Sequence, residues 1–549
     1  MEKITTENLL AELMETCGFG RMTEEAIPVS GGLMHKMYKV ATERGFYAVK
    51  HLNPEIMKRR EAAENFAKAE ALERKLEREG FPIVPSLEFD GKKMLEICGN
   101  NFYVFEWQSG KITDPSGITG EMCRKVGEIL GRMHALEAEN IDSKEAESEK
   151  KNQSFAEDGW FRFEGYLTEA QKQGSRIAGI LFEHKELLKT AQERLSKARQ
   201  KLPAMRCISN DDMDPKNVMW NDGIPSVIDL ECLDYGNPVK SVLTLALQWA
   251  GTAEERFEKS RLIAFFEGYL SVYDNGYRSY EDLYGTVYEW LDWLEYNIRR
   301  ALGLEGGPGE AELGEQEVDR TIGRIRYLAD RETEICDALK YELPPVRPER
   351  YDNHDDGLVY YELFFERRLT QLPVYELPEG YHMVPYRSGD EEEWIEIELS
   401  AKELQSREQG KTVWERYYGG KEELLGERMF FIEDDAGRKV ATATAYYDIY
   451  GRDMSGDAWL HWVAVRRQWQ GKGLSKPLIV SVLRKMKELG YTGVKIPTQT
   501  NTWVACRIYH DLGFRPVKES LTESRAGWKM LEALTGKCFL RESDEAVLN

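Results

Sequence analysis

The sequence predicts an α+β protein with two domains, and three observations lead to that prediction. The chain has 549 residues, too long for a single hydrophobic core, so two or three domains are expected. The proline-rich, charged stretch LPPVRPER at residues 343–350 has the composition of a linker. The pattern of strands and helices changes across this stretch. We therefore place a first domain at 1–342, a linker at 343–357 and a second domain at 358–549, with its core at about 380–520.

Composition and charge limit the classes of function. The chain is 42% hydrophobic and 31% charged, as in soluble globular proteins, and no apolar run approaches the ~20 residues of a membrane span. The N-terminal stretch MEKITTENLLAELMETCGFG lacks the apolar core of a signal peptide. A net charge of −22 argues against nucleic-acid binding, which needs a basic face. The eight cysteines lie singly, so we expect reduced thiols in a cytoplasmic protein, with no membrane partner and an open oligomeric state.

Residues 209–238, SNDDMDPKNVMWNDGIPSVIDLECLDYGNP, carry the densest set of catalytic residue types. The pattern predicts two short strands around a turn at 221–223. Asp212 is followed five residues later by Asn217 and, after the second strand, by Asp229. Phosphate transfer needs a carboxylate beside the attacking hydroxyl and oxygen ligands for Mg²⁺. The set fits that chemistry, although Asp and Asn also commonly do no more than cap turns.

The segments upstream of this hairpin fit the same chemistry. Ser30, Gly31 and Gly32 can bring backbone N–H groups near phosphate. A predicted strand hairpin follows and ends at Lys50, whose ammonium suits nucleotide phosphates. A glutamate-rich helix is predicted over 59–79, and a strand over 101–107.

Apolar helices are predicted downstream, over 241–251, 256–273, 279–302 and 316–341. In the third of these, aromatic side chains are expected in the core: Tyr288, Trp290, Trp293 and Tyr296.

Residues 20–340 resemble, in this order of features, the kinase-like small-molecule phosphotransferases, such as aminoglycoside, choline and homoserine-type kinases. The resemblance implies a bilobal domain, with an N-lobe at about 20–107 and a helical C-lobe at about 108–342. ATP or GTP and Mg²⁺ are the implied cofactors. The implied site residues are Asp212 as catalytic base, Asn217 and Asp229 as metal ligands, Glu70 (or Glu73) as the partner of Lys50, Glu106 at the adenine hinge, and Ser30, Gly31 and Gly32 near the phosphates.

Two positions depart from that family pattern. Asn210 stands two residues before Asp212, where His is usual, and Leu230 follows Asp229, where Phe is usual. Asn can still form hydrogen bonds with nearby backbone. The alternative that the first domain is a non-catalytic ligand-binding or regulatory module stays open.

The second domain contains a glycine-rich turn between a strand and a helix. Strands are predicted over 381–386, 429–433 and 440–448, and a helix over 390–399. A strand at 459–465 then runs into QWQGKGLS and a helix that reaches Leu489. A glycine turn at a helix N-terminus offers free N–H groups and the positive end of the helix dipole, and so binds pyrophosphate.

This turn, together with the downstream run TQTNTWVACRIYHDLGF, resembles the GNAT N-acetyltransferases in Gln468, Gly471, Gly473, Asn501, Ala505, Tyr509, Gly513 and Phe514. The resemblance implies a mixed α/β domain that uses acetyl-CoA. It places the pyrophosphate on Gln470, Gly471, Lys472, Gly473, Leu474 and Ser475. It places the pantetheine against the backbone of Val463 and Val465, with Asn501 nearby. Tyr509 would protonate the leaving CoA thiolate.

A base for the substrate amine is less clearly marked. His461 shares a strand face with Val463 and Val465 by alternation, and its pKa range suits proton transfer. A buried packing histidine and water-mediated deprotonation are the alternatives.

The combined prediction is a bifunctional transferase. It would phosphorylate a hydroxyl of a small molecule and acetylate an amine, and aminoglycoside-like compounds offer both groups. Bifunctional aminoglycoside-modifying enzymes carry the two folds in the reverse order. A metabolite kinase fused to an unrelated acetyltransferase therefore remains an alternative.

Overall fold

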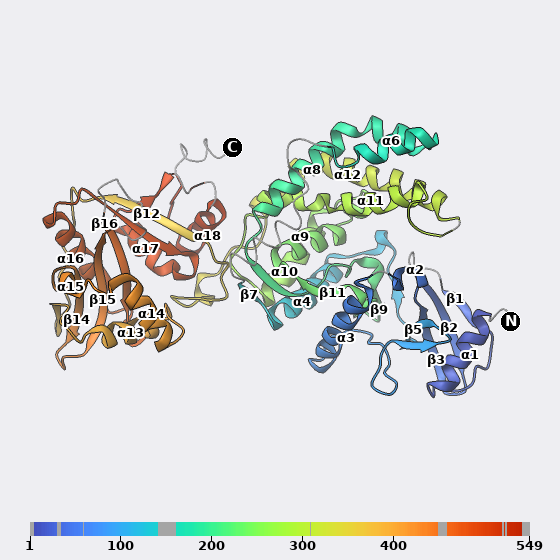
Figure 1. Ribbon diagram of the computed structural model, residues 1–549, viewed down its shortest axis with the longest axis horizontal. Coiled ribbons are helices and arrows are strands. Elements are labelled where there is room, and N and C mark those ends of the chain that lie inside the picture. The colour runs from blue at the N-terminus through green and yellow to red at the C-terminus, as the bar shows by residue number, and fades with distance from the viewer. Residues whose placement is uncertain are drawn as a thin grey trace. The chain divides into compact units, whose positions relative to one another are not determined.

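The computed structural model describes residues 5–29, 35–58, 60–140, 161–307, 309–447, 458–518, 521 and 524–540. The chain divides into two compact units (Figure 1). The first unit comprises Met1–Asp274 and Tyr280–Pro344, and the second comprises Asn275–Ser279 and Pro345–Asn549. The boundary after Pro344 lies inside the proline-rich stretch.

The N-terminal part of the first unit is an antiparallel sheet with strand order β1-β2-β3-β5-β4. Its strands are β1 (Ile27–Val29), β2 (Lys36–Thr42), β3 (Gly45–His51), β4 (Leu95–Ile97) and β5 (Asn100–Glu106). Inward-facing Val40, Val49 and Val104 pack with the apolar face of helix α1 (Thr6–Thr16). Helices α2 (Pro54–Met57) and α3 (Ala62–Arg78) connect β3 to β4. The predicted hairpin that carries Lys50 is confirmed.

Two small sheets follow, and they include three strands from residues 209–238. One has the order β10-β9-β6, built from β6 (Lys111–Ile112), β9 (Val218–Asn221) and β10 (Ile224–Val227). The other has the order β11-β8-β7, built from β7 (Glu139–Asn140), β8 (Met205–Asn210) and β11 (Leu233–Gly236). Asp222 and Gly223 join β9 to β10 with φ of 48° and 75°. Two positive φ values in a row are typical of a tight type I′ hairpin turn, so the predicted turn is confirmed.

The rest of the first unit is helical: α4 (Gly120–Leu136), α6 (Glu164–Gln173), α7 (Ile177–Glu183), α8 (Lys185–Gln200), α9 (Pro238–Trp249), α10 (Lys259–Val272), α11 (Trp290–Ala301) and α12 (Glu310–Tyr341). Helices α4 and α10 cross so closely that an added Cβ on Gly127 or Gly268 would overlap the facing backbone. His134 of α4 bonds through Nδ1 to the Tyr269 hydroxyl at 2.8 Å, fully buried.

The predicted helix over 279–302 is wrong in its first half. A 3-10 helix occupies Tyr280–Glu289, and α11 begins only at Trp290. Gly285 lies against the Arg194 backbone, where even a Cβ would not fit, so this segment is shaped by packing on α8. Tyr288 is buried as expected, whereas three of the predicted core aromatics are only half-buried: Trp290, Trp293 and Tyr296.

The second unit is a mixed sheet with strand order β13-β14-β15-β16-β17-β12-β18. Its strands are β12 (Glu362–Arg368), β13 (Tyr381–Pro385), β14 (Met429–Asp434), β15 (Lys439–Tyr447), β16 (Ala458–Val465), β17 (Gly493–Gln499) and β18 (Arg515–Pro516). Its helices are α13 (Glu391–Ser400), α14 (Arg407–Tyr418), α15 (Glu422–Arg428), α16 (Ser475–Glu488), α17 (Trp503–Asp511) and α18 (Arg525–Thr535). The predicted strands and helices are present. Strand β12 and helices α14, α15 and α18 were not predicted.

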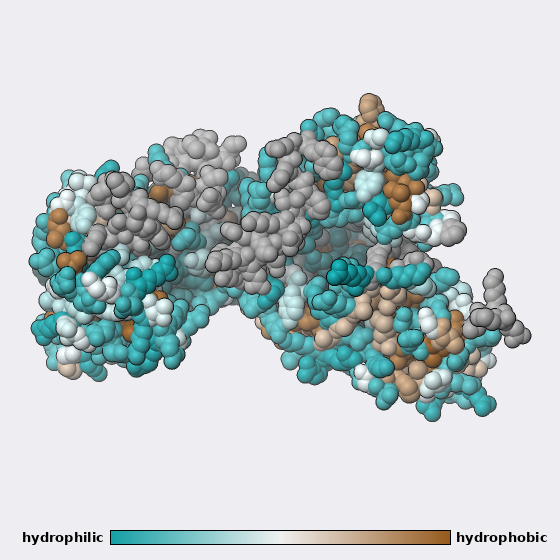
Figure 2. All heavy atoms as spheres, in the orientation of Figure 1, coloured by the Kyte–Doolittle hydropathy of each residue, from teal (hydrophilic) through white to brown (hydrophobic). Residues whose placement is uncertain are grey.

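The molecular surface is mostly hydrophilic on the face seen in Figure 2. Within the described part of the chain, none of the helices combines the length and apolar character needed to cross a bilayer.

Candidate active sites

The loop that carries Asp212 is fixed from both sides by side-chain amides. Asn210, the last residue of β8, accepts a hydrogen bond from the Asp212 N–H at 3.2 Å. The Asn217 Nδ2 donates to the Asp212 carbonyl at 2.8 Å. The residue that departs from the family pattern therefore still holds the loop backbone.

The partly exposed Asp211 anchors the same loop. The Asp211 carboxylate accepts hydrogen bonds from the hydroxyls of Ser209 and Ser241 at 2.9 and 2.6 Å, and lies 3.2 Å from the Lys240 ammonium. Burial alone would raise the pKa of Asp211, but Lys240 and the two hydroxyls outweigh burial and lower it. Asp211 thus stays ionised and holds the start of the loop to α9.

Burial raises the pKa of Asp212 to about 6, against the opposing effect of Lys216 and with support from the nearby Asp214 and Asp229. The Lys216 Nζ donates to Asp212 at 3.2 Å and to Asp214 at 2.9 Å. A carboxylate with a pKa near neutrality is suited to take a proton from a hydroxyl.

Lys50 is brought to the acid hairpin from a position 179 residues upstream. Its Nζ lies 2.8 Å from Asp229 Oδ1 and 3.0 Å from Glu231 Oε1, and its side chain is only 7% exposed. Burial would lower the pKa of Lys50, but the carboxylates of Glu231 and Asp229 outweigh it and raise the pKa. Asp229 itself has φ of +58°, a left-handed conformation that Asp adopts more readily than most residues.

Glu231 is a member of this site that the sequence reasoning missed. Besides Lys50, it accepts a hydrogen bond from His35 Nε2 at 3.2 Å, while His35 Nδ1 accepts the Asn53 N–H at 3.0 Å. The backbone bond to Nδ1 leaves the imidazole proton on Nε2, directed at Glu231. Only its position two residues after Asp229 could have indicated its role.

The expected pairing of Lys50 with Glu70 or Glu73 is wrong for this structure. Glu70 accepts a hydrogen bond from the Tyr103 hydroxyl at 3.0 Å. Glu73 is buried and accepts from the Ser86 N–H at 2.6 Å and from Lys93 at 2.7 Å. Both acids of α3 have other partners, and the buried Lys50 ammonium is compensated by the hairpin acids instead.

The residues present fit a magnesium ion bound largely through phosphates. The Asn217 amide donates through nitrogen, which leaves its oxygen for a cation, and Asp229 supplies a carboxylate. No group of three or more His, Cys, Asp or Glu side chains among the described residues would hold a metal by itself. Mg²⁺ commonly takes one or two protein ligands and completes its shell with phosphate and water.

Two other predicted nucleotide contacts have different outcomes. Ser30, Gly31 and Gly32 lie outside the described residues. Glu106 ends β5, and its carbonyl accepts from the Gln108 side chain at 3.4 Å. The chain then continues into β6, which pairs with β9 of the acid hairpin. The expected hinge therefore leads from the N-lobe sheet to the sheet beside Asp212.

In the second unit, strand β16 separates from its parallel neighbour β17. The two strands pair at Ala458 and Trp459, and no register pair follows within the described strands. Beyond that point β16 carries a bulge opposite β15, where Trp462 has φ of +48°. The edge that contains Val463 and Val465 is thus open to an extended ligand, as β-strand addition requires.

The glycine-rich turn after β16 has a backbone conformation that suits anion binding. Gly471 and Gly473 have φ of +77° and +78°, which glycine adopts without strain. Helix α16 starts at Ser475, and no side chain caps its N-terminal N–H groups within this described segment. Gln470 braces the loop by donating to the Val465 carbonyl at 3.1 Å. The other predicted loop residues are Gln468 in a short 3-10 turn, the exposed Lys472 and the buried Leu474.

Asn501 lies at the start of the segment leading to α17 and is buried. Its Nδ2 donates to the Asp355 carbonyl at 2.8 Å, while its Oδ1 is buried without a hydrogen-bond partner among the described residues. An unsatisfied buried acceptor costs free energy, so a ligand N–H would stabilise it.

Tyr509 of α17 is buried between Phe365 and Phe514. Burial raises the pKa of its hydroxyl, so the group keeps its proton across the physiological range but is a weaker acid than an exposed tyrosine.

His461 is surrounded by aromatic rings rather than by solvent. Its Nδ1 lies 3.2 Å from the Tyr418 hydroxyl, and the ring packs on Tyr417 and Tyr446. Burial lowers the pKa of His461 to about 3, which makes it a weak proton acceptor. These features fit the packing role better than the role of base.

Glu398 is a second residue that the sequence reasoning missed. It lies on α13, is fully buried, and neither carboxylate oxygen has a hydrogen-bond partner among the described residues. Burial raises the pKa of Glu398 well above its ordinary range. Its charge also contributes to the raised pKa values of Tyr418 and Tyr509, so it lies within electrostatic reach of both. A buried carboxyl without a hydrogen-bond partner is unusual, so Glu398 is a candidate functional residue.

Known proteins resemble the two units separately. Residues 25–283 match the phosphotransferase enzyme family, and residues 390–514 match the acetyltransferase (GNAT) family. A mycothiol acetyltransferase from Pseudarthrobacter chlorophenolicus is 27% identical over 184 residues, which cover 32% of this chain and 52% of that enzyme. The chain thus spans about half the length of this curated relative.

Two solved structures align with parts of the chain at low sequence identity. A spectinomycin phosphotransferase in complex with ADP and spectinomycin has a TM-score of 0.43 at 12% identity, covering 61% of this chain and 99% of that one. A GCN5-related N-acetyltransferase from Sphaerobacter thermophilus has a TM-score of 0.24 at 20% identity, covering 40% and 66%. From the two family matches, the chain carries a domain of the phosphotransferase enzyme family followed by a GNAT acetyltransferase domain.

Proposed function

We propose that the first domain transfers the γ-phosphate of ATP, or of GTP, to a hydroxyl of a small molecule. The observation that carries this proposal is the meeting of Lys50 with Asp229, at 2.8 Å, beside the braced Asp212 loop. Asp212 would accept the proton of the attacking hydroxyl. Lys50 would turn from Asp229 to the phosphates, which frees Asp229 to hold Mg²⁺ together with Asn217. The bound ion would neutralise charge on the phosphates.

The second domain, in our proposal, transfers an acetyl group from acetyl-CoA to an amine. The loop of Gln470–Ser475 would hold the pyrophosphate, and the open edge of β16 would pair with the pantetheine. Glu398 would meet the ammonium of the acceptor and take one proton, leaving a free amine whose lone pair attacks the thioester. Without the acceptor, Glu398 holds a proton because its pKa is raised; the acceptor ammonium beside the carboxyl would favour its ionised form, which then takes the proton. The second proton lost by nitrogen balances the one that the CoA sulfur gains from Tyr509.

Acceptors with both hydroxyls and amines suit a chain that carries both domains, and aminoglycoside-like compounds belong to this class. The net charge of −22 suits cationic acceptors. The test is a panel of aminoglycosides, choline, amino alcohols and polyamines, scored separately for nucleotide consumption and for acetyl-CoA consumption. Activity of both kinds on one compound class supports a shared acceptor, and activity on unrelated compounds identifies a fusion of independent enzymes. Absence of nucleotide consumption across the panel would favour a non-catalytic first domain.

A further inference from the structure

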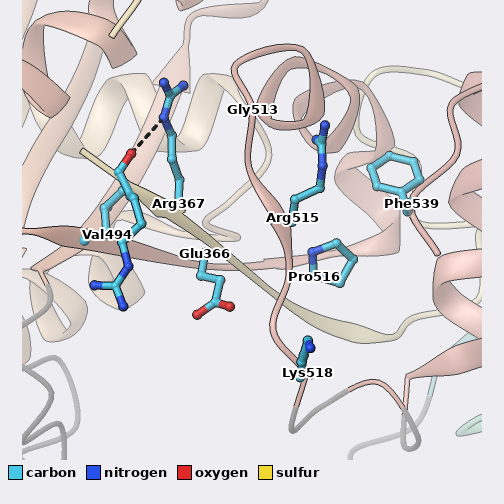
Figure 3. A pocket seen from close by; sticks show the side chains of 10 residues that line it. Glu366, Arg367, Val494, Gly513, Arg515, Pro516, Lys518 and Phe539 are labelled. Carbon is cyan, nitrogen blue, oxygen red and sulfur yellow. Dashed lines mark hydrogen bonds between the residues drawn. The ribbon is translucent and has the colours of Figure 1, made fainter. Parts of the chain in front are cut away.

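A cavity of about 300 Å³ lies at the far end of the second unit's sheet from the glycine-rich loop. It is lined by parts of β12, β17 and β18, and Arg368 is one of its lining residues. Figure 3 shows four others: Arg367, Arg515, Lys518 and Phe539. Val494 in its wall pairs with Ala458, the first residue of β16, whereas the loop follows the last residue of β16. The cavity is therefore distinct from the proposed acetyl-CoA loop.

The charge of this cavity is opposite to that of the chain. Four cationic side chains line it, and Glu366 is the one carboxylate in its wall. Among the described residues, none of these four cations forms an ion pair with a carboxylate, although the chain has 96 acidic and only 74 basic residues. Unpaired positive charge gathered in one cavity of an acidic protein favours the binding of an anion there.

The two half-buried guanidinium groups are held in place by neutral acceptors. Arg367 donates to the carbonyls of Gln371 and Arg368, and Arg515 donates to the Phe514 carbonyl at 2.7 Å. Backbone carbonyls orient these groups but do not neutralise their charge. Desolvation lowers the pKa of Arg367, and no described carboxylate forms an ion pair with it that would raise the pKa.

The shape of the cavity depends on a glycine. Gly513 has φ of +86°, and an added Cβ would come within 3.3 Å of Arg367 Nη1. The Phe539 ring, itself buried, supplies an apolar wall beside the cations. Rigid guanidinium forks next to an apolar surface suit the bidentate binding of a phosphate that is attached to a small organic group. A volume of about 300 Å³ is sufficient for a small ligand.

We propose that this cavity binds a phosphorylated small molecule, through Arg367 and Arg515 with support from Arg368 and Lys518. The ligand is either a polyphosphate of the nucleotide type or a phosphate monoester such as the product of a hydroxyl phosphorylation. The site stands on its own geometry and does not depend on the proposed acetyl transfer.

The test is calorimetric titration of the full chain, saturated with acetyl-CoA, with pyrophosphate and separately with O-phosphoethanolamine. The wild-type chain is expected to bind at least one of these probes at a site whose affinity falls about tenfold to a hundredfold in Arg367→Ala and in Arg515→Ala, as the loss of a charge-assisted hydrogen bond implies. Arg407→Ala, an exposed arginine of α14, is the matched control and should bind as wild type does.

A second variant protects the test against misfolding. Arg368 and Lys518 are exposed, so Arg368→Ala/Lys518→Ala removes charge without disturbing buried contacts, and it should weaken binding in the same direction. Binding of pyrophosphate alone assigns a nucleotide-type ligand, and binding of O-phosphoethanolamine alone assigns a phosphate monoester. Unchanged affinity and stoichiometry for both probes in all of these variants would overturn the proposal.

Discussion

The reactivity of Asp212 depends on two opposing effects, its partial burial and the ammonium of Lys216 at 3.2 Å. With a pKa of about 6, the carboxyl is ionised above that pH and protonated below it. We therefore expect the phosphorylation rate to fall as pH drops through about 6. In Lys216→Ala the acid limb of the pH–rate profile should move to higher pH, because Lys216 lowers the pKa of Asp212.

The control for this variant is Lys197→Ala, which removes an exposed lysine from α8. Its pH–rate profile should match that of the wild type. If the acid limb of the pH–rate profile stays at the same pH in Lys216→Ala, the pH dependence does not arise from Asp212.

Glu398 gives a prediction in which stability and activity move in opposite directions. Its pKa in the folded state is raised, so the folded protein holds a proton that the unfolded chain releases, and wild-type stability should fall as pH rises above the ordinary glutamate range. Glu398→Gln has no ionisable carboxyl at this position, so its stability should not fall in this way as pH rises. Its free energy of unfolding should exceed that of the wild type by more at pH 8 than at pH 5, while acetyl transfer falls about 10²–10⁴-fold.

Glu392→Gln on the exposed face of the same helix is the control, and it should change neither quantity appreciably. Denaturant titrations at the two pH values, with acetyl-CoA consumption measured on the same samples, provide both results. Full acetyl transfer in Glu398→Gln would leave water-mediated deprotonation as the mechanism.

At the scale of the elements, the turn between β16 and α16 depends on residues that can adopt a positive φ. Gly471 has a left-handed conformation with open space around it, so Gly471→Ala should add strain of about 1–2 kcal/mol without a steric clash. We expect weaker acetyl-CoA binding together with modest destabilisation. Gly490→Ala, at φ of +93° after α16, should show similar destabilisation with unchanged affinity. Equal acetyl-CoA affinity in both variants and the wild type would remove the loop from the cofactor site.

The elements that sequence patterns identified are those with strong local signals. The hairpin ending at Lys50, the turn at Asp222 and Gly223 and the glycine loop before α16 all have turn chemistry or alternation that operates within a few residues. Strand β12 lacked such a signal, since its sequence ELFFERR alternates only in part and its partners, β17 and β18, lie far along the chain. The 3-10 segment at Tyr280–Glu289 was missed because packing on α8, rather than periodicity, determines its winding.

The residues of the candidate sites likewise fall into two groups, those that a local sequence pattern predicts and those that only the three-dimensional structure identifies. Asp212, Asn217 and Asp229 fall within one motif, so their spacing alone predicted a common site. Glu231 and Glu398 become conspicuous only through burial and through the partners they have or lack, which a linear pattern does not contain. The predicted pairing of Glu70 with Lys50 is wrong for a related reason. Tyr103 and Lys50 lie on neighbouring paired strands, but Tyr103 binds Glu70, whereas Lys50 binds Asp229.

At the scale of the whole chain, we propose that each domain catalyses its own reaction, phosphorylation in the first domain and acetyl transfer in the second. Asp212→Asn should lower nucleotide-dependent phosphorylation about 10²–10⁴-fold and leave acetyl transfer unchanged. Tyr509→Phe should slow CoA release near neutral pH with acetyl-CoA affinity nearly intact, and should leave phosphorylation unchanged. Each loss follows from removing one proton-transfer group from one domain.

The most direct test measures both activities in the wild type and in these two variants, on the same acceptor panel and under the same conditions. We expect a crossed result, in which each variant loses one activity and keeps the other. Phosphorylation that continues at the wild-type rate in Asp212→Asn would contradict it.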